Sequence, residues 1–250
     1  MPIILKSEND CRSSHIYWLL PKDSKPSMIC LIRFHIIEND TIYEFACNPD
    51  CFLCHVYSIT GWLWLSINRH AFPDCWLGVN FLAVTGKFAF PILGELQAAG
   101  VQVDGYWADD ACIDETRPHD DQPEAAEITT ARNNSGWNGI YIGGTAFKKQ
   151  REVDPAQYAR SARIASGFMD VVVTSGVATG HAADVAKIDT FRKNCGDTAL
   201  GLASGITPEN AAQYADAVDL FMVATGINFD GDFYNIDPLR LKRLMDLTQK

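Results

Sequence analysis

From residue 76 to the end, the chain alternates short apolar runs with helical segments, and this alternation restricts the fold more than any other feature. Six apolar runs, rich in Val, Ile, Leu and aromatic residues, cover residues 76–84, 103–109, 139–147, 169–175, 199–204 and 220–227. Several are nearly continuous, which is typical of strands buried on both faces of a parallel sheet. The spacing therefore predicts βαβ units and a parallel α/β sheet.

Helix signals lie between the later runs. Four helices are predicted, and they begin at Asp154-Pro155, His181, Thr207-Pro208 and Asp237-Pro238. In three of them a capping residue precedes a proline, which is favoured at the first helical position. The fourth, residues 181–194, carries a stripe of apolar residues at helical spacing.

Six strands are visible where a closed (β/α)8 TIM barrel has eight, and 250 residues is the usual length of one such barrel. The sequence therefore predicts an α/β TIM barrel that is incomplete or irregular in its first two βα units. Residues 76–250 are predicted to form units 3 to 8. Residues 1–75 form a divergent segment that is expected to supply the first strands, with 28–37 and 60–67 as the candidates.

Charge and composition limit the partners. The net charge of −10 argues against nucleic-acid binding, because no basic surplus is available to neutralise phosphates. No signal peptide and no apolar run long enough to span a bilayer is recognisable, so a cytoplasmic protein is expected. The 8 cysteines are then expected to be reduced. Cofactors and the oligomeric state, a homo-oligomer included, are left open.

Residues 109–127 are acidic and loop-like, and the chain stays polar to Asn138. Long loops in compact domains are commonly functional lids or flexible segments. The sequence does not decide between a lid and a solvated loop.

The last two strand ends predict a phosphate site. In TIM barrels a phosphate is commonly held by the loops after strands seven and eight, together with a helix N-terminus. Ser204 and Gly205 precede the helix signal at Thr207-Pro208, and Thr225 and Gly226 follow the last strand. Glycine lets backbone N–H groups come close to an anion. The alternative is that these glycines only form tight turns.

Other polar residues lie at strand ends, where catalytic groups of this fold are found. Asp109 and Asp110 are candidates for a general acid or base, although successive strand residues point to opposite faces. Lys148 is a candidate for stabilising negative charge. Three further residues are candidates for orienting a substrate: Asn80, Thr174 and Ser175.

Three cysteines offer a different interpretation. Cys47, Cys51 and Cys54 have the CxxxCxxC spacing of radical-SAM iron–sulfur sites. They lie in a cysteine-rich, poorly patterned segment, where this spacing readily arises by accident. No metal site is therefore predicted, and a radical-SAM enzyme remains the lesser alternative.

Several segments together resemble the BtpA-like family of TIM-barrel proteins. They are Trp76-Leu-Gly-Val-Asn80-Phe-Leu, Asp104-Gly-Tyr-Trp-Ala-Asp109-Asp110-Ala, Gly143-Gly-Thr-Ala-Phe-Lys148, Asp170-Val-Val-Val-Thr-Ser-Gly176, Ala203-Ser-Gly-Ile-Thr-Pro-Glu-Asn210 and Val223-Ala-Thr-Gly-Ile227. The resemblance covers residues 72–246 and does not extend to residues 1–70. It implies a barrel of the ribulose-phosphate-binding type, and it links the chain to proteins associated with photosystem I assembly or labelled as phosphoribosyltransferases. It fixes no reaction.

The sequence thus predicts an enzyme that binds a small phosphorylated metabolite, with a reaction of lyase, isomerase or glycosyl- or phosphoribosyl-transfer type. The alternative from another class is a non-catalytic barrel that acts as a binding or assembly factor. Ligand binding without turnover would distinguish the binding or assembly factor from the enzyme.

Overall fold

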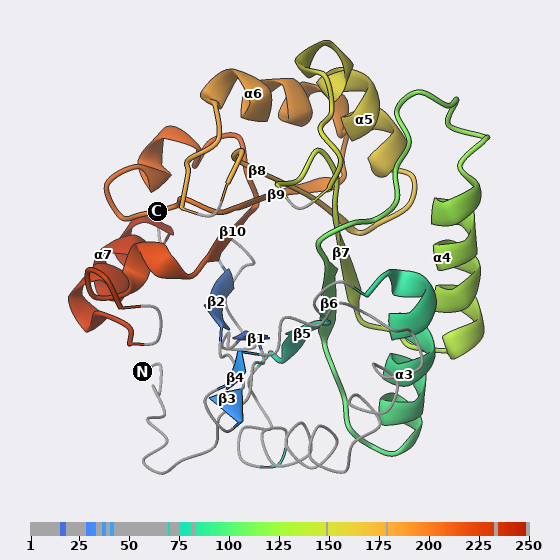
Figure 1. The fold of residues 1–250 in the computed structure, drawn as a ribbon, viewed down its shortest axis with the longest axis horizontal. Coiled ribbons are helices and arrows are strands. Elements are labelled where there is room, and N and C mark those ends of the chain that lie inside the picture. Colours follow the sequence, from blue (N-terminus) through green and yellow to red (C-terminus); the bar gives the residue numbers. More distant parts are fainter. Residues whose placement is uncertain are drawn as a thin grey trace.

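The computed structural model describes residues 16–18, 29–33, 37–38, 41–42, 70, 76–81, 84–148, 150–178, 180–232 and 235–248. Six strands lie parallel in chain order: β5 (Gly78–Asn80), β6 (Gly105–Ala108), β7 (Ile140–Gly144), β8 (Val171–Ser175), β9 (Ala199–Ala203) and β10 (Leu220–Val223). They form a curled α/β half-barrel (Figure 1). The predicted parallel sheet is confirmed, with each strand inside its predicted run.

Two strands from the N-terminal segment extend this sheet beyond β10. Strand β2 (Ile29–Arg33) pairs in parallel with β10, and β1 (Ile16–Trp18) pairs antiparallel with β2. A separate hairpin joins β3 (Ile37–Glu38) to β4 (Thr41–Ile42). Strand β2 lies within the predicted strand 28–37, whereas the predicted strand 60–67 lies outside the described residues. A complete (β/α)8 barrel therefore stays a prediction.

Helices follow one another around the outside of the curled sheet. In Figure 1, α3 (Gly86–Ala98) and α4 (Pro123–Ser135) cover one side, α5 (Tyr158–Ala165) and α6 (Val185–Asn194) the next, and α7 (Pro238–Thr248) the side near the C-terminus. The Asp154 carboxylate caps the turn η1 (Pro155–Gln157) that leads into α5, by accepting a hydrogen bond from Ala156 N at 2.8 Å. Where a helix was predicted to begin at Thr207-Pro208, the structure has only the 3-10 turn η2 (Ala211–Gln213).

Not all of the polar stretch 109–138 is a loop, because α4 begins at Pro123. Only Ala125 and Ile128 of this helix are buried, so the sequence lacks the apolar stripe that identifies most helices. The loop before it is anchored: Gln122 exchanges hydrogen bonds with the backbone of Asp114 at 2.7 and 2.9 Å. The expectation of a loop over residues 109–127 is corrected accordingly, because its last residues, 123–127, belong to α4.

The sheet has a hydrophobic cluster on each face. The larger one fills the space between the sheet and the helices and contains Tyr106, Tyr141, Val172, Leu200 and Phe221. The smaller one lies on the opposite, inner face of the curl and contains Trp107, Ile142, Phe147, Val173, Ala203, Leu220 and Met222. Side chains alternate between these faces along each strand, so a residue's position in the register determines which face it reaches.

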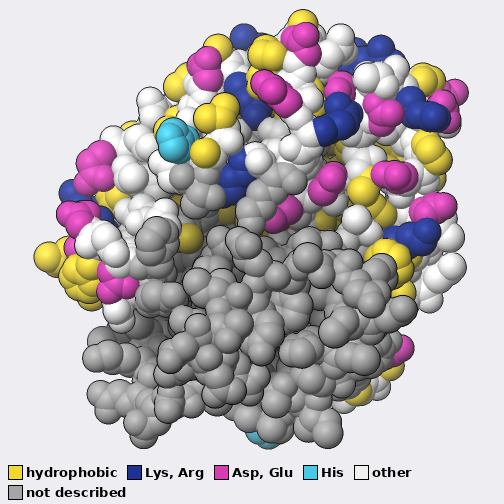
Figure 2. Space-filling model, in the orientation of Figure 1, with side chains coloured by type: hydrophobic (Ala, Val, Ile, Leu, Met, Phe, Trp, Pro, Cys, Tyr) yellow, Lys and Arg dark blue, Asp and Glu magenta, His cyan; other side chains and the backbone are white. Residues whose placement is uncertain are grey.

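No helix in the described part of the chain combines the length and apolar character needed to cross a membrane. On the face seen in Figure 2, acidic and basic side chains are interspersed over the described surface.

Candidate functional site

The carboxyl end of the inner face brings Asn80 and Asp109 together. Asn80 is aligned with Trp107 in the β5–β6 register, and Trp107 belongs to the inner cluster. Asp109 follows Trp107 by two residues, so strand geometry directs it to the same face. The amide Nδ2 of Asn80 donates to the Asp109 carboxylate at 3.4 Å and to Trp107 O at 2.9 Å. This contact links two of the predicted site residues.

The Asn80 side chain has an unused acceptor. The residue is only 8% exposed, and its Oδ1 is buried without a hydrogen-bond partner in the described structure. Because Nδ2 faces two acceptors, the amide cannot be reversed without losing both bonds. A buried acceptor without a donor is costly, on the order of 1–3 kcal/mol. The predicted role of Asn80 in orienting a substrate stays a prediction.

Asp110 is oriented differently from Asp109. Its Oδ1 accepts hydrogen bonds from Cys112 N at 2.7 Å and from Gln150 Nε2 at 3.0 Å. Burial raises the pKa of this carboxyl above its usual value, although the bond from Cys112 opposes the shift. Asp110 thus supports the turn after β6, while Asp109 contacts Asn80.

Lys148 and Ser204 meet although they are far apart in the sequence. The Lys148 ammonium donates a hydrogen bond to Ser204 Oγ, and the backbone N–H of Lys148 donates to Ser175 Oγ at 2.9 Å. Ser204 follows β9 with a left-handed φ of 71°, an uncommon conformation for a residue with a side chain. Such conformations cluster at functional sites, where neighbouring contacts maintain them.

The two loops predicted to hold a phosphate are in contact. A side chain added at Gly226 would come within 1.8 Å of Ile206 O, so the turn η3 (Thr225–Ile227) lies directly on the loop after Ser204. Gly205 has a φ of +66° and packs on the backbone of His181 and Ala182. The two N–H groups nearest the predicted helix start are already used, because Thr207 N donates to Asn210 Oδ1 and Glu209 N to Thr207 Oγ1.

Thr174 and Ser175 are fully buried at the end of β8. The Thr174 hydroxyl donates to Ala146 O at 3.2 Å, and the Ser175 hydroxyl donates to Gly176 O at 2.8 Å while accepting from Lys148 N. These contacts hold the loop that carries Lys148. The predicted role of the two residues in orienting a substrate stays a prediction.

Sequence reasoning missed two residues beside this site. Gln150 Nε2 donates to Gly144 O at 2.7 Å and to Asp109 O at 3.1 Å, which ties the end of β7 to the end of β6. Lys187 contacts the ends of β7 and β8 from helix α6. Neither belongs to a recognisable motif. A lysine in the first turn of a helix, where cations are disfavoured, is the one signal that points to Lys187.

Among the described side chains, no group of three or more His, Cys, Asp or Glu is placed to hold a metal ion. Cys47, Cys51 and Cys54 lie outside the described residues, so the iron–sulfur alternative is not tested.

Comparison with solved structures finds similar chains at low sequence identity. Phosphoribosyl anthranilate isomerase from Thermus thermophilus is 14% identical with a TM-score of 0.47, over 73% of this chain and 76% of that one. A structure described as native KDPGal is 11% identical with a TM-score of 0.48, over 81% and 90% of the two chains. The carboxyl transferase domain of Rhizobium etli pyruvate carboxylase is 11% identical with a TM-score of 0.46, over 74% and 36%.

No curated protein sequence matches the chain. The model of the BtpA family matches residues 143–250, a range that contains Lys148, Ser204 and Thr225. The resemblance to the BtpA family seen in the sequence motifs is thereby confirmed for this part of the chain.

Proposed function

We propose that the protein is an enzyme that binds a small phosphorylated metabolite at the carboxyl end of its curled sheet. Ser204, Gly205, Thr225 and Gly226 bind the phosphate, and Lys148 neutralises negative charge on it or on the reacting group. Asp109 transfers a proton, and Asn80 orients the substrate beside it. The reaction is of lyase, isomerase or group-transfer type.

The observation that carries this proposal is the contact between the Lys148 ammonium and Ser204 Oγ. It brings a cation and a hydroxyl to the place where two glycine loops touch. Cations and hydroxyls are groups with which proteins bind phosphate. Asn80 and Asp109 stand at the ends of the neighbouring strands β5 and β6, where a carboxylate can accept a proton from the ligand.

Binding is tested first with inorganic phosphate and ribose 5-phosphate, by isothermal titration calorimetry. Lys148→Met and Ser204→Gly should each weaken binding at least about tenfold, the usual value of a charge-assisted hydrogen bond. Glycine suits the left-handed φ at position 204, so Ser204→Gly removes the hydroxyl without straining the backbone. Lys193→Met, at an exposed position of α6, is the control. The proposal fails if neither compound binds the wild type.

Catalysis is tested separately with Asp109→Asn. The wild type is incubated with a panel of phosphorylated sugars and acids, and products are followed by NMR. Asp109→Asn should keep the binding and lose the turnover, whereas the exposed control Asp120→Asn should keep both. Turnover that survives in Asp109→Asn would remove the assignment of Asp109.

A non-catalytic binding protein is the second candidate, because an ammonium beside a hydroxyl suits anion binding whether or not a reaction follows. It predicts phosphate binding with no product from any member of the panel.

A further inference from the structure

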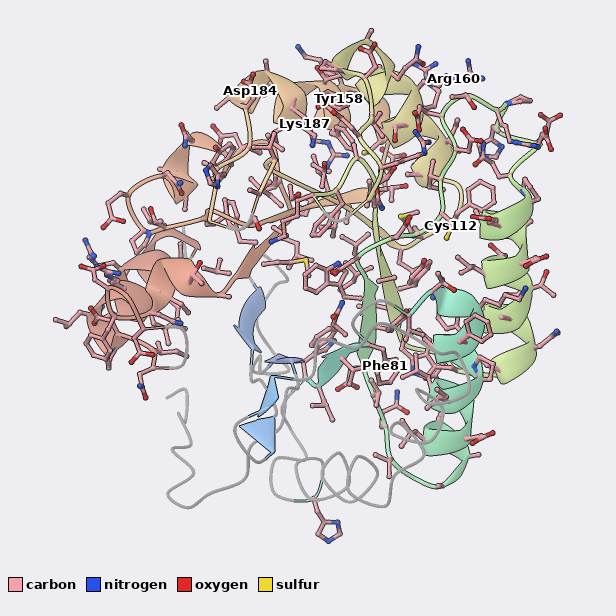
Figure 3. The ribbon with its side chains drawn as sticks, in the orientation of Figure 1. Phe81, Cys112, Tyr158, Arg160, Asp184 and Lys187 are labelled. Carbon is pink, nitrogen blue, oxygen red and sulfur yellow. The ribbon has the colours of Figure 1, made fainter. Side chains whose placement is uncertain are left out.

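Lys187 joins the ends of two strands from outside the sheet. It lies in the first turn of α6, and its Nζ donates to Ala146 O at 2.7 Å and to Ser175 O at 2.8 Å. Figure 3 shows Lys187 together with Tyr158 and Asp184, where α5 and α6 meet. The ammonium therefore connects the loop after β7 to the last residue of β8.

The loop that Lys187 holds is strained. Ala146 has a left-handed φ of 47°, a backbone conformation that is unfavourable for a residue with a Cβ. Its carbonyl oxygen accepts two hydrogen bonds, from Lys187 Nζ and from Thr174 Oγ1. A strained conformation persists where its surroundings determine it from several sides. Lys187 is one of the groups that do so here.

Both atoms that Lys187 contacts belong to residues that place Lys148. Ala146 precedes Lys148 by two residues, and Ser175 accepts the Lys148 backbone N–H at 2.9 Å. We propose that Lys187 is a positioning residue, which fixes the backbone at Ala146 and Ser175 so that the Lys148 ammonium stays at Ser204 and binds an anion there. This inference rests on the proposed anion-binding function of Lys148 and Ser204.

Burial opposes the charge of Lys187, whereas the two carbonyl oxygens and two aromatic rings around its ammonium favour that charge. In the described part of the chain no carboxylate comes within the 4.0 Å of an ion pair with Nζ. Burial lowers the pKa of this ammonium to about 8. The Tyr158 ring lies 4.9 Å from Nζ and that of Phe191 5.9 Å. Burial raises the pKa of Tyr158, and the exposed carboxylates of Glu152, Asp154 and Asp184 around it raise that pKa further.

A pH dependence follows from this geometry. Above about pH 8 Lys187 loses its charge, and the hydrogen bonds to the two carbonyl oxygens lose their charge-assisted strength. The loop that carries Lys148 is then held less firmly. Anion affinity should decline over the same pH range, apart from any change in the anion itself.

The test measures the Kd of sulfate by calorimetry between about pH 6.5 and pH 9.5, because sulfate keeps its charge throughout this range. Lys187→Met should weaken binding by about fivefold or more near pH 7. Wild-type affinity should decline with a midpoint near pH 8, and Lys187→Arg, which stays charged, should bind sulfate with a flat profile. Lys193→Met is the control and should retain the wild-type profile.

The outcomes separate the two proposals. If the wild type binds sulfate but Lys187→Met binds it equally well, the positioning role is wrong and the anion site stands. If Lys187→Arg keeps the full decline near pH 8, Lys187 is not the titrating group and the inference is likewise overturned. If the wild type binds neither sulfate nor phosphate, the anion site fails and the role of Lys187 fails with it. Should Lys187→Met not fold, the Lys187→Arg profile decides alone.

Discussion

At the scale of single residues, two tyrosines with nearly identical surroundings differ in what their hydroxyls do. Tyr106 and Tyr141 both lie between the sheet and its helices, and their rings are stacked. The ring centroids are 5.9 Å apart, and the ring planes are inclined by 7°. Tyr106 Oη donates to Val84 O at 3.0 Å. Tyr141 Oη is buried with no partner in the described structure. Removing each hydroxyl in turn therefore compares a buried hydroxyl that makes a hydrogen bond with a buried hydroxyl that makes none.

Tyr106→Phe should lower the free energy of unfolding by about 1 kcal/mol or more, because it removes a hydrogen bond and leaves Val84 O without that donor. Tyr141→Phe should be neutral or stabilising, because it removes a buried polar atom that lacks a partner. Urea denaturation of both variants measures the two values. Equal losses would contradict the assignment of the hydroxyl partners.

Cys195 supplies a pH dependence of stability. The residue is 1% exposed, and burial raises the pKa of its thiol from 9.0 to about 11. Between these values the unfolded chain releases the proton while the folded chain keeps it. Stability is thus fully present below pH 9 and is lost as the pH rises through about 11. From about pH 8 to about pH 10.5, the wild type should lose stability relative to Cys195→Ala. A constant difference between the two would mean that the thiol does not titrate in this way.

At the scale of helices and strands, an element could be predicted where its buried residues form a recognisable apolar pattern in the sequence. The six parallel strands are nearly continuous apolar runs, so their order and type could be predicted. Helix α4 could not, because it buries only Ala125 and Ile128. What places α4 is its packing on α3, where Gly94 of α3 lies against the backbone of Ser135 of α4. A contact between elements of this kind leaves no local signature.

Gly94→Ala tests that contact. Alanine is the better helix former by about 1 kcal/mol, so propensity alone predicts a gain in stability. An added Cβ, however, would lie 2.3 Å from Ser135 O, and relieving this overlap requires α3 and α4 to separate. We expect a net loss of about 1–2 kcal/mol, since overpacking typically costs more than the propensity returns. Thermal or urea unfolding measures it, with the exposed Glu95→Ala as the control. A gain in stability would show that the helices are not in close contact.

At the scale of the whole molecule, the site could be predicted as a region but not as a set of contacts. The strand ends were evident, and the structure joins Asn80 to Asp109 and Lys148 to Ser204. The alternation of strand residues also predicts that Asp109 and Asp110 diverge. Lys187 and Gln150 escaped prediction because they act on backbone atoms of distant strands, and only the packed molecule brings them there. The helix predicted after Thr207 was wrong, because the backbone there forms short successive turns in which only Ala211–Gln213 is helical, as the 3-10 turn η2.

Ligand binding should be visible as stability of the whole chain. A compound present at one hundred times its Kd stabilises the folded state by about 2.7 kcal/mol. For a chain of this size that corresponds to a rise in Tm of about 5–11 °C. Inorganic phosphate or ribose 5-phosphate should produce such a rise in the wild type, and Lys148→Met should reduce it at the same ligand concentration. A rise that is unchanged in Lys148→Met would place the binding elsewhere.

The pairing of β2 with β10 has a consequence for handling the chain. The N-terminal segment is the part that least resembles a barrel, which makes it an obvious candidate for removal. Yet β10, whose end carries Thr225 and Gly226, lies between β9 and β2. A chain shortened to begin at residue 76 would expose the backbone edge of Leu220–Val223, and unprotected edges of buried, apolar strands recruit other chains. We expect such a shortened protein to aggregate during expression, however well its remaining strands are formed.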